Sequence, residues 1–230
     1  MIMRLPKYIS LTGGYSRRQV EKLIEEKKIT INGRVAEIGS KIKKEDVIYV
    51  EGKCLTPKSS NIYIAFNKPI GVECTAEKKE NNIIDFINYP QRIFPIGRLD
   101  KDSEGLILLT NDGDIVNKIL KNENNNEKEY LVTLDKPITN RFMLTQMANG
   151  IEISGIITKQ CLVSKVSENT IRIILTQGLN RQIRRMCESL GFEVTHLQRV
   201  RIMNITLENL EKGKWRELNE REIVHLKGKQ

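Results

Sequence analysis

The chain has 230 residues, of which 39% are hydrophobic and 29% charged, so it is long enough to bury a sizeable core, and one domain with a small appendage is the natural division. No apolar run reaches the length of a membrane span, and the N-terminal residues lack the apolar segment and cleavage site of a secretory signal. We therefore expect a cytoplasmic monomer with no membrane partner.

The chain is basic, with a net charge of +9. Residues 1–60 hold 13 Lys or Arg against 7 Asp or Glu, so they carry +6 of that charge. Such an excess indicates a polyanionic partner, most often a nucleic acid, although a basic surface also serves solubility.

No metal or disulfide chemistry is indicated. The four cysteines are scattered without a C-x-x-C pair: Cys54, Cys74, Cys161 and Cys187. With only His196 and His225 to add, the ligands of a zinc site are not clustered at the short spacing it requires. We expect ordinary thiols in a reducing compartment.

The first 50 residues show the pattern of a compact unit. Ser16 and Gln19 have the spacing of a capping box, which predicts a helix carrying Val20, Leu23 and Ile24 on one face. The alternating segment 29–35 surrounds an Asn-Gly pair and predicts a hairpin, and a further strand is expected at 47–50. Basic side chains lie on the helix or just past the turn: Arg17, Arg18, Lys22 and Arg34.

This segment, Met3–Val50, resembles an S4 domain, a small module in which two helices and a hairpin present a basic face to folded RNA. The resemblance assigns RNA contacts to those four basic residues. Residues 54–61 mix Pro, Ser and Asn and are expected to form a linker. The expected organisation is an S4-like domain at 1–53, the linker at 54–61 and a second domain at 62–230.

The remainder of the chain alternates short strands with a few helices. Strands are expected at 63–66, 105–110, 130–134, 161–166, 171–176 and 194–201, and helices at 112–120 and 181–190. Because few long helical crossovers join these strands, we expect an α+β fold with a mixed, largely antiparallel sheet.

One loop stands out for its chemistry. The segment from Gly97 to Gly105 reads Gly-Arg-Leu-Asp-Lys-Asp-Ser-Glu-Gly and places three acidic groups between two apolar stretches. Functional carboxylates often lie on such loops, held by a rigid sheet, although an acidic loop is more often merely solvated.

Four segments in order resemble the motifs of the RsuA-type family of pseudouridine synthases, which modify ribosomal RNA. The hallmark is Gly-Arg-Leu-Asp followed by Ser-x-Gly-Leu, at 97–106. The others are Asn-Lys-Pro-Ile-Gly at 67–71, Lys-Glu-Tyr-Leu-Val at 128–132 and the segment 175–186, which contains Gln-Ile-Arg-Arg. The wording around Asp100 and at 127–132 is closest to family members that act on the large ribosomal subunit.

The resemblance implies an isomerase that breaks the N1–C1′ bond of a uridine and rejoins C1′ to C5. Nothing is oxidised and only a proton leaves, so no cofactor is expected. A carboxylate is needed beside C1′, as nucleophile or as stabiliser of positive charge, and the family motif assigns that role to Asp100. Arg184 matches the cation that keeps this carboxylate ionised.

The target base must be flipped out of folded RNA, and a flipped base stacks on aromatic side chains. Tyr130 matches the family's stacking residue, and Leu175 is expected on the other side of the base. Arg98 is expected to fill the space left by the base or to hold its phosphate. Four further arginines are expected to contact backbone phosphates: Arg181, Arg185, Arg199 and Arg201.

Three alternatives stay open. The same chemistry could act on small-subunit ribosomal RNA or on a tRNA, since RNA shape decides the target. The chain could be a non-catalytic, S4-type RNA-binding assembly factor. A two-carboxylate glycosidase is a poorer interpretation, because we do not expect Asp100 and Asp102 to face each other and because it leaves the basic charge unexplained.

Overall fold

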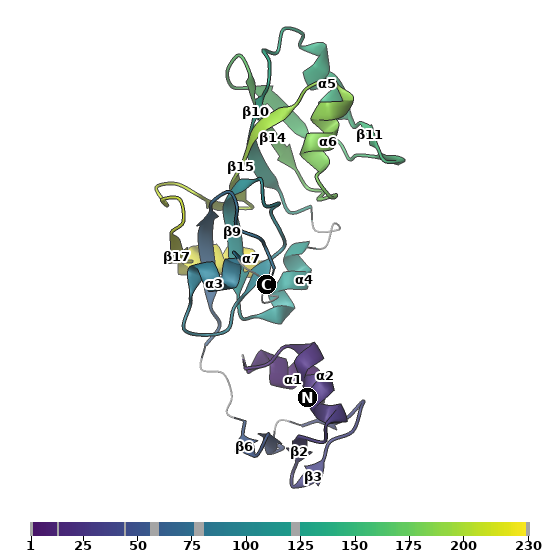
Figure 1. The fold of residues 1–230 in the computed structure, drawn as a ribbon, viewed down its shortest axis with the longest axis vertical. Coiled ribbons are helices and arrows are strands. Elements are labelled where there is room, and N and C mark those ends of the chain that lie inside the picture. Colours follow the sequence, from purple (N-terminus) through teal and green to yellow (C-terminus); the bar gives the residue numbers. More distant parts are fainter. Residues whose placement is uncertain are drawn as a thin grey trace. The chain divides into compact units, whose positions relative to one another are not determined.

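A computed structural model describes residues 2–12, 14–43, 45–55, 60–75, 81–120 and 125–228. The chain divides into two compact units. The first, here called the N-terminal unit, comprises Met1–Ile62, Tyr89–Ile93 and Thr110–Gly113; the second, the synthase unit, comprises Tyr63–Asn88, Phe94–Leu109 and Asp114–Gln230 (Figure 1).

The N-terminal unit packs two helices on small antiparallel sheets. The helices are α1 (Leu5–Leu11) and α2 (Arg17–Glu25), and a four-stranded sheet has the order β3 (Arg34–Val35), β2 (Ile29–Ile31), β5 (Ile48–Val50) and β6 (Lys53–Cys54). A second pair joins β1 (Met3–Arg4) to β4 (Lys41–Ile42). Apolar residues from both helices and from the sheet form one buried cluster, so this unit has its own core.

The local signals in the N-terminal unit are confirmed. The Ser16 side chain accepts from the Gln19 N–H, and Gln19 reaches back to the Ser16 N–H, so the capping box is complete. Asn32 and Gly33 take positive φ at the hairpin turn, and the Asn32 side chain accepts from the Val47 N–H at 2.9 Å. The turn is thereby tied to the following strand.

The expected linker begins too early. Lys53 and Cys54 form β6, which pairs with β5, and Leu55 packs against the core of the N-terminal unit. Gly52 turns the chain at a φ of 78°, so the strand after it folds back onto the sheet and extends it. Residues 56–59, the middle of the expected linker, lie outside the described residues.

The synthase unit is built on one mixed sheet, as expected, with the order β13-β14-β10-β15-β9-β7-β17 and with β8 and β16 as side branches. Its strands are β7 (Tyr63–Lys68), β8 (Phe94–Ile96), β9 (Glu104–Thr110), β10 (Lys128–Leu134), β13 (Leu162–Lys165), β14 (Thr170–Leu175), β15 (Val194–Ile202), β16 (Ile205–Thr206) and β17 (Trp215–Glu217). Strands β9 and β15 pair in parallel. The antiparallel pairs are β10–β14, β10–β15, β13–β14, β15–β16 and β7–β17. Every residue of β9 is buried, which explains its uninterrupted apolar run.

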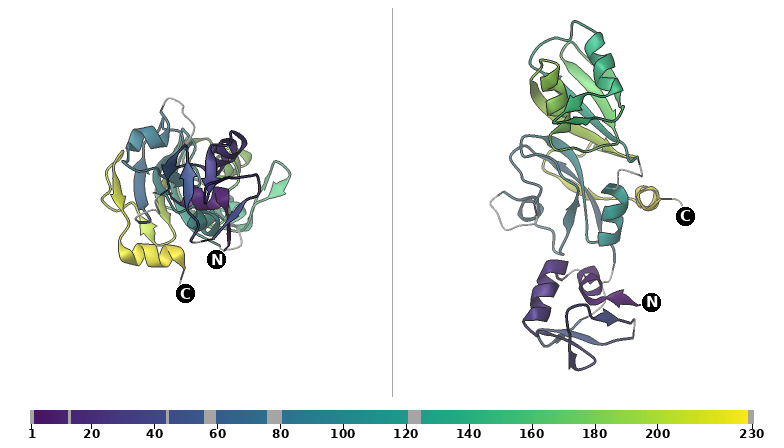
Figure 2. Two further views of the ribbon diagram at one scale, coloured as in Figure 1. Left: turned by 90° about the horizontal axis from the view of Figure 1, so that it is seen from below. Right: turned by 90° about the vertical axis from the view of Figure 1, so that its right-hand side faces the viewer.

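Helices cover both halves of this sheet (Figures 1 and 2). Those predicted from the sequence are α4 (Gly113–Leu120) and α6 (Gln182–Ser189), and those that were not are α3 (Ile83–Ile87), α5 (Phe142–Asn149) and α7 (Glu220–Lys227). Helices α4 and α7 pack on β7 and β9 through one apolar cluster, whereas α5 contacts β13 and α6 contacts β15. A short hairpin, β11 (Glu152–Ile153) with β12 (Ile156–Ile157), was also missed and contacts α6. Within the described residues, no helix is long and apolar enough to cross a membrane.

A buried carboxylate stabilises the start of β9. The Glu104 side chain is 4% exposed and lies 2.7 Å from Lys212 Nζ and 3.0 Å from His196 Nε2. Burial raises the pKa of Glu104, but the hydrogen bonds from Lys212 and His196 outweigh it and bring the pKa below the ordinary 4.5.

We expect Glu104→Gln to lower the free energy of unfolding by about 1–3 kcal/mol at neutral pH. Because the folded-state pKa is lowered, the stabilisation is complete above 4.5 and is lost as the pH falls through the folded value. Urea denaturation of both proteins should therefore show a difference at neutral pH that shrinks as the pH falls below 4.5. A difference that persists unchanged in acid would contradict this.

Candidate active site

The acidic loop between β8 and β9 is held in place by the segment that follows β7. The Gly71 N–H donates to the Lys101 carbonyl at 2.8 Å, and the Leu99 N–H donates to Cys74 Sγ at 3.3 Å. Lys68 is fully buried, and its Nζ donates to the carbonyls of Pro69 and Val72. The Asn-Lys-Pro-Ile-Gly motif thus forms a rigid support beneath the loop, and burial lowers the pKa of Lys68.

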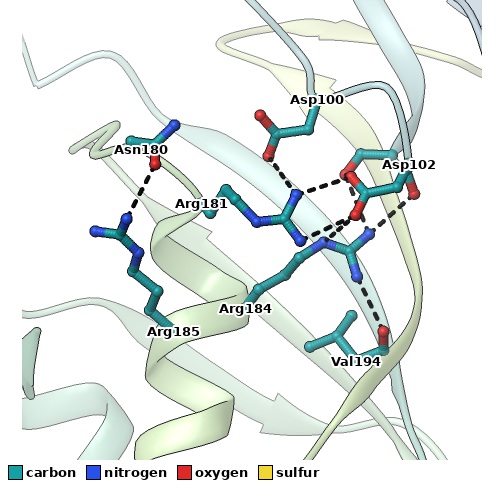
Figure 3. A network of polar contacts seen from close by, with 8 residues as sticks. Asp100, Asp102, Asn180, Arg181, Arg184, Arg185 and Val194 are labelled. Carbon is teal, nitrogen blue, oxygen red and sulfur yellow. Dashed lines mark hydrogen bonds and ion pairs between the residues drawn. The ribbon is translucent and has the colours of Figure 1, made fainter.

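The loop turns so that Asp100 and Asp102 approach the same arginine. The Ser103 N–H donates to the Asp100 carbonyl at 3.1 Å, which closes the turn. Arg181 binds Asp102 through two hydrogen bonds of 3.2 and 3.0 Å, and its Nη1 lies 3.9 Å from Asp100 Oδ2 (Figure 3). Asp100 and Asp102 were not expected to face each other, and this prediction is wrong because both carboxylates approach Arg181. The segment is a turn rather than a strand, and even in a strand residues two apart share a face.

Arg181 reaches this position because of its backbone. It occupies the N-cap of α6 with a φ of 49°, a left-handed conformation that is uncommon for residues other than glycine. Strained backbone of this kind clusters at functional sites. The expected phosphate contact does not describe Arg181 in this structure, where it binds acidic side chains.

Arg184 does not pair with Asp100 as expected. Its Nη2 donates to the Asp102 carbonyl at 2.9 Å, its Nη1 donates to the Val194 carbonyl at 2.9 Å, and its Nε lies 3.4 Å from Asp102 Oδ2 (Figure 3). Arg184 starts one turn further along α6 than Arg181, so its side chain meets the end of the loop and the start of β15. Among the described contacts, the cation within 4 Å of Asp100 is Arg181.

Asp102, which the sequence analysis set aside, holds both arginines. Burial raises its pKa, but the hydrogen bonds of Arg181 and the charge of Arg184 prevail, and the pKa lies below its usual value. Asp102 is therefore ionised at neutral pH and fixes the positions of the two guanidinium groups next to Asp100.

A pocket of about 510 Å³ opens beside this network. Asp100, Tyr130 and Leu175 line it together, as expected, and so does Arg98. Tyr130 is only 8% exposed, and its ring lies 6.0 Å from the Arg199 guanidinium carbon. A volume of this size is in the range of small-molecule sites.

Two of the arginines that were expected to contact phosphates are bound to other groups of the protein instead. Arg199 is 4% exposed, and its guanidinium donates to the carbonyls of Leu106 and Arg98. Arg201 is bound by Glu127 at 3.0 Å and Glu129 at 2.7 Å. Both arginines lie on β15 inside the sheet, where neighbouring strands supply their partners, and the sequence pattern did not reveal those partners.

The other basic residues stay candidates for RNA contact. Arg185 is hydrogen-bonded to Ser154 and Asn180 at the edge of α6, and Arg98 is exposed. In the N-terminal unit, the residues assigned by the S4 resemblance are all exposed: Arg17, Arg18, Lys22 and Arg34.

Lys128, which was not predicted as a site residue, also lines the pocket. It belongs to the Lys-Glu-Tyr motif two residues before Tyr130, and that spacing on a strand was the signal available. Among the described residues, no group of three His, Cys, Asp or Glu could hold a metal ion. Burial raises the pKa of Cys187 to about 12, so this thiol is not a nucleophile at neutral pH.

Two family models match the chain. Residues 62–189 match the family described as RNA pseudouridylate synthase, and residues 3–48 match the S4 domain. The chain therefore belongs to the RNA pseudouridylate synthase family and is an isomerase that makes pseudouridine. The sequence-based prediction of the family and of the enzyme class is confirmed.

Individual relatives of this chain carry more specific descriptions than the family does. Proteins described as "Dual-specificity RNA pseudouridine synthase RluF" are 52% identical over 226 residues in Salmonella typhi and 51% identical over 227 residues in Escherichia coli K12, covering 97% of this chain and 78% of each relative. A "Ribosomal large subunit pseudouridine synthase B" from Bacillus subtilis is 38% identical over 234 residues, 97% of this chain and 95% of that protein. A solved structure titled "Crystal structure of pseudouridylate synthase" is 33% identical with a TM-score of 0.71, covering 97% of this chain and 99% of that one.

Proposed function

We propose that this enzyme isomerises one uridine in a stem-loop of large-subunit ribosomal RNA, with Asp100 as its catalytic carboxylate. The observation that carries the catalytic assignment is the pocket in which Asp100, Tyr130 and Leu175 meet. The target is supported by the Bacillus subtilis relative, whose description names the large ribosomal subunit. The exposed basic residues of the S4 domain would add affinity for folded RNA through phosphate contacts.

In the proposed mechanism the uridine flips into the pocket and stacks on Tyr130, with Leu175 on the opposite face. Asp100 then acts at C1′ while the glycosidic bond breaks, and the uracil turns so that C5 bonds to C1′. The C5 proton is lost to solvent and N1 takes up a proton. Arg181, which Asp102 holds in place, puts a positive charge 3.9 Å from the Asp100 carboxylate, and Arg184 binds Asp102 in turn. Bonds are redistributed within one nucleotide, so the reaction needs no cofactor.

A tRNA is the second candidate substrate. The Salmonella typhi and Escherichia coli relatives are described as dual-specificity enzymes, which favours more than one RNA target. We also propose that the enzyme is a monomer, which sedimentation of the purified protein would test. Its proposed location is the cytoplasm.

The test uses RNA carrying tritium at uridine C5, incubated with the protein without added cofactor or metal. Transcripts of large-subunit RNA, small-subunit RNA and a tRNA pool are compared with a large-subunit stem-loop of shuffled sequence. We expect release of tritium from the large-subunit transcript and none from the shuffled control. Release only from small-subunit RNA or tRNA would reassign the target, and release from none would favour a non-catalytic RNA-binding factor.

The stacking role of Tyr130 gives a separate prediction. Tyr130→Ala should lower kcat by about 10- to 100-fold, because base–aromatic stacking is worth about 1–3 kcal/mol, and should change RNA affinity less. Filter binding and tritium release measure the two effects. Tyr130→Phe keeps the ring and serves as the control for folding; an alanine variant that unfolds would make Tyr130 a core residue instead.

A further inference from the structure

Lys128 lines the pocket together with Tyr130 and Leu175. It is the first residue of β10, directly opposite Leu175 of β14, and it shares a face of the strand with Tyr130. If the uracil is stacked between Tyr130 and Leu175, both faces of the ring are covered. The ring edge, which carries its two carbonyl oxygens, is then the part open to a polar side chain, and Lys128 lines the same pocket.

The ammonium group of Lys128 is not committed to an acid in the part of the chain that the structure describes. Its Nζ donates to the Asn126 carbonyl at 3.3 Å, a long hydrogen bond that leaves two other N–H groups. The acidic residues on either side of it in sequence, Glu127 and Glu129, are held by Arg201. An ammonium half-buried in a pocket without an acidic partner is costly and is typical of a functional group.

Three of the other cations that line the pocket are already engaged within the protein. Arg181 and Arg184 bind Asp102, and Arg199 donates to two main-chain carbonyls. The charged or titratable side chains that line the pocket together with Lys128 are Arg98, Asp100, Tyr130, Arg181, Arg184 and Arg199. Among the described residues that line the pocket, Asp100 is the one acid, and Asp102 behind them pairs with Arg181 and Arg184. The positive side chains still outnumber these two carboxylates, which suits a reaction in which negative charge develops on the base.

Such charge develops in the first chemical step. When the N1–C1′ bond breaks, its electron pair stays on N1 and spreads to the carbonyl oxygens of the ring, and Asp100 balances the positive charge at C1′. After the ring turns, C5 bonds to C1′, which uses the electron pair of the anionic base and gives a neutral adduct. The C5 proton then leaves to solvent and N1 takes up a proton, which gives the neutral product base. A hydrogen bond to a ring oxygen is therefore stronger in the transition state than in the bound substrate, which is the condition for catalysis.

We propose that Lys128 is a catalytic residue that, as an ammonium ion, donates a hydrogen bond to a carbonyl oxygen of the flipped uracil and stabilises the negative charge of the departing base. This inference rests on the proposed function and adds a residue to it. Burial, together with the nearby charge of Arg199, lowers the pKa of Lys128 to about 8. The ammonium form therefore prevails at pH 7 and is lost as the pH rises through 8, so a donor role and a base role predict opposite pH profiles.

The experiment compares Lys128→Met, which removes the charge, with Lys128→Arg, which keeps it. Tritium release from the large-subunit transcript gives kcat and KM between about pH 6.5 and pH 9, a range that brackets the lysine's transition. We expect Lys128→Met to lower kcat by about 100-fold with little change in KM, and Lys128→Arg to stay within about 10-fold of wild type. The wild-type kcat should fall above pH 8, whereas that of Lys128→Arg should hold to higher pH because a guanidinium stays protonated.

The matched control is Lys165→Met, because Lys165 lies on the edge strand β13 with its Nζ on the Ile138 carbonyl, outside the pocket. Its kinetics should equal those of wild type. A Lys128→Met kcat within about threefold of wild type, or a change in KM alone, would overturn the proposal. So would a wild-type rate that rises through pH 8 with an inactive Lys128→Arg, since that pattern marks a base. Failure of the wild type to release tritium from any RNA would instead overturn the proposed function itself.

Discussion

Asp100→Asn is expected to abolish tritium release from uridine-labelled RNA, with a loss of about 10⁴-fold or more. The amide has the same shape but can neither attack C1′ nor balance positive charge there. Asp100 is partly exposed, and its nearest cation, Arg181, is also bound by Asp102, so the substitution should leave the fold and the RNA affinity intact. Circular dichroism and filter binding check both points.

The matched control is Asp102→Asn, which removes the other carboxylate bound to Arg181. It removes the carboxylate charge that pairs with Arg181 and Arg184, while Arg184 keeps its hydrogen bonds to the Asp102 and Val194 carbonyls. We therefore expect turnover to fall by about 10- to 100-fold and to stay measurable. Loss of activity to the same extent in both variants would mean that the two carboxylates act as one unit. Full activity of Asp100→Asn would refute the catalytic role of Asp100 and show that another group acts at C1′.

Gly105→Ala is expected to destabilise the synthase unit by about 3 kcal/mol or more. Gly105 has a φ of 105°, and a Cβ there would overlap the Arg199 carbonyl oxygen and lie 2.8 Å from the Arg199 nitrogen. These are main-chain atoms of the parallel partner strand, so they cannot swing aside. The variant must strain its own backbone or separate β9 from β15, and either change would shift the Asp100 loop.

Urea denaturation measures this loss, and tritium release from the surviving folded fraction shows whether the loop has moved. Gly178→Ala is the control, because a Cβ at Gly178 meets no atom within 4 Å and its φ is not positive. We expect the control to change the free energy of unfolding by less than about 1 kcal/mol. If Gly105→Ala were as stable as the control, the close approach of β9 and β15 would not constrain this position.

Elements with strong local signals were predicted well. The capping box at Ser16, the Asn-Gly turn and the apolar run of β9 are properties of neighbouring residues, and each forms as expected. Helix α7 was missed although Asn219 and Glu222 form a capping box there. Helix α3 is too short, at five residues, to show a periodic pattern.

The site was predicted unevenly, and the pattern has a physical reason. The order of the motifs predicted that Asp100, Tyr130 and Leu175 lie close together, and all three line one pocket. Tyr130 and Leu175 lie on strands, where side chains alternate between the two faces of the sheet. The partners of the arginines were not predictable, since a long side chain can reach several acids and only the packing of α6 on the loop selects one. Arg184 and Arg201 accordingly bind groups that the sequence did not indicate.

The sequence by itself determined the family and the reaction, and it predicted Asp100 as the catalytic carboxylate, because these depend on which residue types occur in which order. Only the tertiary structure decided that Arg181 rather than Arg184 approaches Asp100, that Arg199 is buried, and that Lys128 enters the pocket. Each of these depends on which main-chain carbonyls and carboxylates from distant segments lie within reach of a flexible cation. The left-handed backbone of Arg181 directs its side chain toward the Asp100 loop, and the register of β10 puts Lys128 opposite Leu175. No local pattern in the chain specifies either feature.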